Sequence, residues 1–141
     1  MSSTGIRFGV SGAALIRAAD AMLRALGGGA EVSLLFPLTS SPDDTSSQLG
    51  LTDPGVEQVP ISPVVARNLP TENNGPRRRM EFLLPASSVA DEATNRDFAS
   101  GQALLEAALG LLHQGEHFHV EGIVTEYFAG TPYLYRVTAV E

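Results

Sequence analysis

Five side chains near the C-terminal end of the sequence could bind a metal ion. His113, Glu116, His117, His119 and Glu121 fall within nine residues. On a strand, His117 and His119 would project from the same face, as two imidazole ligands of one metal ion do. His113 is then the candidate for a third ligand. The alternative is that His117 and His119 face solvent, with the apolar residues that alternate with them facing the core.

Three tyrosines follow in the same stretch, at Tyr127, Tyr133 and Tyr135. Their rings could stack on a bound small molecule, which makes them candidate ligand-binding residues. The alternative is that they form cross-strand pairs or a protein interface, where an apolar ring with a polar tip is favoured. Neither alternative requires a cofactor, and we expect none.

Arg77, Arg78 and Arg79 form a short basic run, and guanidinium groups match phosphate oxygens in pairs. The chain nevertheless carries a net charge of −7, and all nine of its basic residues are arginine. Three arginines on an acidic protein do not supply the clustered positive charge that nucleic-acid binding needs, so we expect no nucleic-acid partner. The alternative role of the run is to flank an apolar strand and discourage edge-to-edge pairing.

The sequence contains no arrangement typical of an active site. The absence of cysteine excludes disulfides, thiolate metal sites and cysteine nucleophiles. There is no G-x-S-x-G turn to present a nucleophilic serine. Gly27, Gly28 and Gly29 follow a predicted helix and precede a predicted strand, which reverses the order of a phosphate-binding strand, loop and helix. We therefore expect a protein that is not an enzyme.

Two segments are predicted to be helices, and they must position these side chains. Over 11–26, with Ser11 as N-cap, Leu15, Ala19, Met22 and Leu26 recur at helical spacing and form the face expected to be buried. The glycines that follow end this helix. A second helix is expected over about 100–113, with Ser100 as its N-cap and a leucine-rich interior.

Strand patterns account for most of the remaining sequence. Alternation predicts a weak strand at 6–10, a central strand at 32–36 and a further strand at 80–84. Residues 59–69 read as extended chain, and Pro60 and Pro63 confine them to a sheet edge. A hairpin closes the chain, with strands at 118–124 and 133–139.

The length of 141 residues, 43 % of them hydrophobic, fits one domain spanning 1–141. We expect an α+β fold with an antiparallel, barrel-like sheet, two helices and a C-terminal hairpin. Two polar segments, at about 39–55 and 70–76, would stay mobile or order against a neighbouring molecule.

The C-terminal hairpin resembles that of the small head-to-tail connector and tail-completion proteins of tailed phages and prophages. The residues that carry the likeness are Phe118–Gly122, Phe128–Tyr133 and Arg136–Val140. The resemblance implies a small barrel closed by a strand–turn–strand, and assembly into rings through mobile loops. It assigns no functional residue in this sequence.

The leading hypothesis is a non-enzymatic structural or assembly protein, of phage or prophage origin. It would act as a homo-oligomer or on a protein partner, through a sheet edge and the segment 39–55. The alternative is a small-molecule-binding or metal-dependent domain that uses His117, His119 and the tyrosines. No segment approaches the ~20 apolar residues that span a bilayer, and the first residues lack a secretory signal, so we expect a cytoplasmic protein without a membrane partner.

Overall fold

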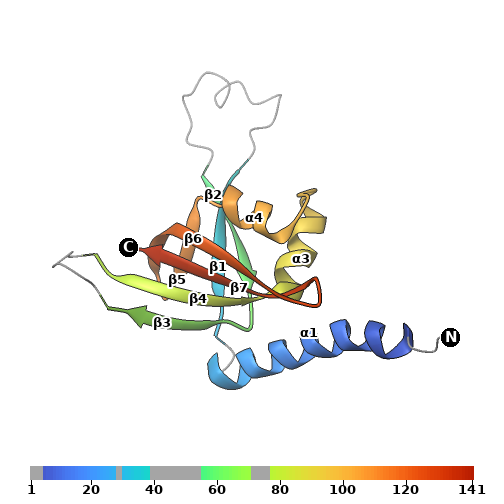
Figure 1. Cartoon of the computed structure of the whole chain (residues 1–141). Helices are drawn as coiled ribbons and strands as arrows, with labels where there is room; N and C mark the ends of the chain where they lie inside the picture. The colour runs from blue at the N-terminus through green and yellow to red at the C-terminus, as the bar shows by residue number, and fades with distance from the viewer. Residues whose placement is uncertain (1–4, 28–29, 39–54, 71–76) are drawn as a thin grey trace, which may run out of the picture.

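The structure, a computed structural model, describes residues 5–27, 30–38, 55–70 and 77–141 (Figure 1). The polar segments predicted at 39–55 and 70–76 lie outside the described residues except for Gly55 and Pro70. Within the described ranges the fold is a mixed α+β one, as expected. In chain order its elements are α1 Gly5–Gly27, β1 Val32–Pro37, β2 Val56–Ile61, β3 Val65–Leu69, β4 Arg79–Pro85, α3 Ala86–Asn95, α4 Gly101–Ala107, β5 Gly110–His113, β6 Glu116–Phe128 and β7 Thr131–Val140.

The seven strands form one antiparallel sheet in the order β2-β1-β5-β6-β7-β4-β3. The prediction of a central strand at 32–36 is confirmed by β1, and the extended segment 59–69 supplies both outer strands. Only Ser62, Pro63 and Val64 separate β2 from β3, so a strong bend brings one end of each outer strand to the same corner. Among the described residues no pairing joins β2 to β3. The expectation of a barrel-like sheet is therefore wrong, because the sheet stays open.

β6 is shared between the two halves of this sheet. Its first residues, Glu116–Phe118, pair with β5, and from His119 onwards it pairs with β7. Glu121 is an extra residue in the β6–β7 ladder, because Val120 lies opposite Ala139 while Gly122 lies opposite Thr138. Such a bulge bends the strand and increases its twist, which lets β6 pass from one half to the other.

The core lies between the inner faces of the two halves, and α3 and α4 cover it (Figure 1). The alternation expected of half-buried strands is clear in β4, where Met80, Phe82 and Leu84 are buried. Phe82 meets Phe118 of β6 edge to face, with ring centroids 5.6 Å apart. Burial of these rings supplies a large share of the stabilising apolar area.

A chain of ion pairs crosses the outer face of β3, β4, β7 and β6. Glu81 is buried, and its carboxylate accepts from Arg67 and from Arg136. Arg136 also lies 3.6 Å from Glu126. Two arginines thus face two glutamates, so this chain of ion pairs carries no net charge.

The helices differ from the prediction in number and extent. The described residues contain three, because Ala86–Asn95 also forms one. α1 begins at Gly5, so the strand expected at 6–10 and the N-cap expected at Ser11 are wrong.

The helix expected over 100–113 is correct only in its first half. Ser100 caps α4 as predicted, since its side chain accepts from the Ala103 N–H at 3.1 Å. After Ala107 the chain becomes β5, where Leu111 pairs with Leu34 on one side and Phe118 on the other. A short apolar run is compatible with a buried strand as well as with a helix. Here the pairing of Leu111 with β1 and β6 makes it a strand.

α1 buries a different side from the one its leucine spacing suggested. Leu23 is 4 % exposed, whereas Met22 is 62 % and Leu26 is 70 % exposed. The helix ends against the β2–β3 connection, where Gly27 comes so close to the Val64 carbonyl that no side chain would fit. That approach fixes the rotation of α1 and turns Met22 and Leu26 outward.

Candidate functional site

The three histidines are divided between the two faces of the β5–β6 hairpin. Its two-residue turn, Gln114 and Gly115, has positive φ at both positions and sets the register His113 opposite Glu116. His117 and His119 share the face away from the core, as predicted, and their ring centroids lie 4.6 Å apart. His113 lies on the other face, so it does not join them.

His113 is 7 % exposed and lies edge-on to Phe82, with ring centroids 5.4 Å apart. Its Nδ1 is buried without a hydrogen-bond partner. In the described ranges no group of three or more His, Asp or Glu side chains is placed to hold a metal ion. The paired His117 and His119 are thus the part of the metal hypothesis that the geometry brings together.

The three tyrosines differ in burial and in surroundings. Tyr127 is exposed near the hairpin tip. Tyr133 lies beside α1, in an apolar hollow of about 140 Å³. Tyr135 is 4 % exposed, and its hydroxyl is so close to Gly101 that a side chain there would collide with it.

Tyr135 also lines a cavity of about 320 Å³ between α1, the start of α3 and the hairpin. Burial raises the pKa of the Tyr135 phenol, and the nearby Tyr127 raises it further. Neither of these two hollows is lined by all three rings.

Two of the three consecutive arginines are held by acidic partners on β6. Arg78 lies 2.9 Å from Glu116, and Arg79 forms a two-pronged pair with Glu121 at 2.8 and 3.0 Å. Arg77 is exposed. These ion pairs favour the interpretation that the arginines flank the apolar strand β4, and they argue against phosphate binding.

Glu116 and Glu141 form a carboxyl pair beside Arg78. The hydrogen bond from the Glu141 side chain lowers the pKa of Glu116, and the charge of Arg78 lowers it further. The same hydrogen bond raises the pKa of Glu141. The two carboxyl groups therefore titrate as a pair and not independently.

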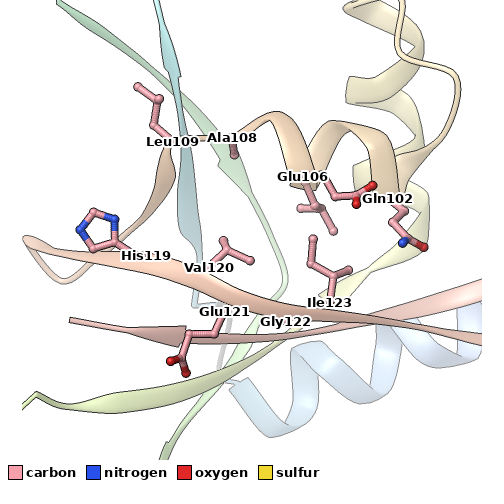
Figure 2. Close-up of a pocket in the computed structure, with 10 residues that line it drawn as sticks. Gln102, Glu106, Ala108, Leu109, His119, Val120, Glu121, Gly122 and Ile123 are labelled. Atoms are coloured by element: carbon pink, nitrogen blue, oxygen red, sulfur yellow. The ribbon is translucent and has the colours of Figure 1, made fainter. Parts of the chain in front are cut away.

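A cleft of about 440 Å³ lies between α4 and β6 (Figure 2). Leu105 and Glu106 of α4, with Leu109 after it, form one wall. Residues 119–123 of β6 form the other. At one end, the Thr125 hydroxyl donates to Gln102 Oε1 at 3.1 Å and so ties the walls together.

Sequence reasoning placed His119 on a strand but did not find this cleft. The wall of the cleft that α4 forms lies within residues 100–113, which were predicted to be one continuous helix. One feature of the sequence could have indicated the cleft. The chain between Gly115 and Ala129 is longer than the segment before it that could pair with it, so part of the later strand must lack a neighbour on that side.

Met22 and Leu26 on α1 form an exposed apolar stripe together with the half-buried Leu15, at spacings of seven and four residues. Beside it lies the hollow that contains Tyr133, whose other walls are Ala19, Leu23, Leu83 and Leu134. The stripe therefore continues into an apolar depression.

Comparisons of the chain with protein-family models, with curated proteins and with solved structures found no match. Of the helices the structure describes, none combines the length and the apolar character needed to span a membrane.

Proposed function

We propose that this protein is a non-enzymatic assembly protein that associates with a second copy of itself through the exposed stripe of α1. The observation that carries the proposal is the exposure of Met22 and Leu26 next to an apolar hollow. Contiguous apolar surface on a soluble domain marks interaction sites. Leucine and methionine at helical spacing suit packing against another helix.

Self-association through one patch favours a closed, two-fold arrangement, because the same stripe can then be buried in both copies. The basic residues Arg17 and Arg24 lie at the far side of the helix from the stripe. They can therefore stay in solvent when the stripe is covered.

The experiment is native mass by light scattering over a wide concentration range. The native mass of the full chain is expected to be that of a discrete oligomer of the 14.9 kDa protomer. The double variant Met22→Lys/Leu26→Lys is expected to have the mass of the monomer. The matched control, Ala13→Lys/Ala21→Lys, adds the same charge at exposed positions of the same helix outside the stripe. A wild-type monomer at every concentration, or a double variant that keeps the oligomer mass, contradicts the proposal.

The likeness of the C-terminal hairpin to phage connector and tail-completion proteins supports a phage or prophage origin for such an assembly. Capsid or tail genes next to the gene of this protein would strengthen this origin, and metabolic genes there would contradict it. The native mass bears on it as well: connector proteins assemble into rings, so a ring larger than the two-fold dimer would favour this origin, whereas a dimer would not.

A second candidate function is the binding of a small apolar molecule. The cavity beside Tyr135 favours it, because its walls are apolar apart from Ser87, Ser100, Thr131 and the phenol. Thermal-shift screening with small phenols and aliphatic alcohols tests it, with Ile16→Trp as the variant that fills the cavity.

The metal alternative rests on His117 and His119. Elemental analysis of untagged protein tests it: near one equivalent of zinc, nickel or iron, lost in His117→Ala/His119→Ala, would favour it.

A further inference from the structure

We propose that the cleft between α4 and β6 binds an extended peptide of a partner protein. The peptide adds as a strand to the free edge of β6 and places a basic side chain beside Glu106. This site goes beyond the proposed self-association, because it lies on a different surface from the α1 stripe.

The edge of β6 is free because β5 is much shorter than β6. β5 pairs only with Glu116–Phe118 of β6, and the chain enters β5 from α4 through Ala108 and Leu109. Beyond Phe118, none of the described strands lies beside β6 on the side away from β7. Along an antiparallel strand, alternate residues direct N–H and C=O groups to each side. Unpaired groups of this kind are a template for an added strand.

The walls of the cleft suit an extended chain rather than a helix. Figure 2 shows residues 119–123 running along one side, with α4 and Leu109 along the other. The bond between Thr125 and Gln102 closes one end. The open edge therefore runs over 119–124, about 20 Å at the rise of a strand.

Side chains in the cleft indicate what the peptide should carry. Val120 and Ile123 line the cleft and are half-buried, so they offer apolar contacts to peptide side chains. Leu109 is 49 % exposed at the rim. An aliphatic residue of the peptide would cover these groups.

Charge points to a basic residue in the peptide. Glu121 is neutralised by Arg79, and Figure 2 shows it pointing away from α4. Glu106 lines the cleft and forms no ion pair with any described residue. It is therefore the uncompensated charge of the site, and it favours lysine or arginine over acidic residues.

The test uses a displayed library of random nonapeptides, selected on the full chain that carries Met22→Lys/Leu26→Lys. In this background, failure of the peptide site is distinct from failure of self-association. The peptides enriched most are then labelled with fluorescein and measured by anisotropy. Enrichment of alternating aliphatic residues with at least one lysine or arginine is expected.

Two comparisons decide the mode of binding. Glu106→Arg is expected to weaken binding at least tenfold. Asp91→Arg, the same change at an exposed position of α3, should leave it within twofold. N-methylation of alternate peptide amides should abolish binding, because it removes the donors that a β-strand needs. Hydrogen exchange of the amides at 119–124 should slow when peptide is bound.

Absence of any enrichment over the Glu106→Arg protein overturns the proposal. Equal binding by the N-methylated peptide also overturns it, since side chains alone would then be recognised. A third contrary result would be slowed exchange on α1 rather than on β6, which would place the peptide on the stripe. Pairing of two copies through β6 would appear as a change of native mass on Glu106→Arg and would likewise refute the partner peptide.

Discussion

The phenol of Tyr135 shows how burial changes the acid–base behaviour of a single side chain. Its pKa is raised by burial and by Tyr127, so the folded protein resists its ionisation more than the unfolded chain does. The stabilisation is therefore fully present below the unfolded pKa near 10 and is lost as the pH rises through the folded pKa. We expect the protein to lose stability at alkaline pH.

Absorbance titration and chemical unfolding at pH 8 to 11 check this prediction, and those values bracket the tyrosine pKa. Tyr135→Phe should remove much of the alkaline loss. Tyr127→Phe, an exposed position, should leave most of it. Equal alkaline loss in wild type and Tyr135→Phe would assign the effect to another group.

The carboxyl pair of Glu116 and Glu141 gives a second prediction. Replacing Glu141 with Ala removes its side-chain hydrogen bond, so the pKa of Glu116 should rise toward its ordinary value while Arg78 still holds it down. Carbon-detected NMR titration of the glutamate carboxyl groups measures this directly. An unchanged Glu116 titration would mean that Arg78 alone sets its pKa.

Glu116 and Glu141 change the stability of the fold with pH in opposite directions. The lowered pKa of Glu116 stabilises the fold above its unfolded pKa, and that gain is lost as the pH falls through the folded pKa. The raised pKa of Glu141 stabilises the fold at low pH, and that gain is lost as the pH rises through its folded pKa. We therefore expect the two contributions to offset each other.

At the scale of elements, the docking of α1 depends on Gly27. A methyl group there would meet the backbone carbonyl of Val64, which cannot move aside as a flexible side chain would. Gly27→Ala should cost about 1–3 kcal/mol of unfolding free energy, as overpacking does, although alanine is the better helix former. Urea unfolding measures the change.

Gly122→Ala is the matched control, because nothing lies within 4 Å of a methyl group at that position. Its unfolding free energy should stay within about 0.5 kcal/mol of wild type. If both substitutions cost the same, the contact between α1 and the β2–β3 connection does not hold the helix in place.

The elements that the sequence predicted correctly are those whose pattern is local. The alternation in 80–84 and in the two strands of the C-terminal hairpin can be recognised without any distant partner. β5 was missed because Leu111 and Leu112 form a strand only through partners far along the chain, in β1 and β6. The buried side of α1 was predicted wrongly for a similar reason, because the close contact between Gly27 and the Val64 carbonyl determines which side of the helix is buried.

The candidate site was harder to predict than the fold. His117 and His119 were placed on one face correctly, because strand alternation is enough for that. The cleft beside β6 depends on where β5 ends and on the bulge at Glu121, and neither leaves a mark in hydrophobic patterning. The different burial of the three tyrosines depends in turn on how α1 and α4 pack around the hairpin.

At the scale of the whole molecule, residues 39–54 join strands that are already neighbours. Pro37 pairs with Val56, and the Leu38 N–H donates to the Gly55 carbonyl at 3.3 Å. Replacing 39–54 with a short Gly-Ser turn should therefore leave the fold intact. Because we place self-association on α1, native mass should also stay unchanged, as light scattering can check. A fall to the monomer would return the interface to this segment.

The order of the strands also determines when the fold can be completed during synthesis. β7 is made after every other strand, yet it lies between β6 and β4 near the middle of the sheet. β1 is made early, but it gains its second neighbour only when β5 is made, more than seventy residues later in the chain. A ribosome that stalls before Thr131 therefore leaves a chain whose β4 and β6 both have unpaired edges, and such a nascent chain is a ready client for chaperones.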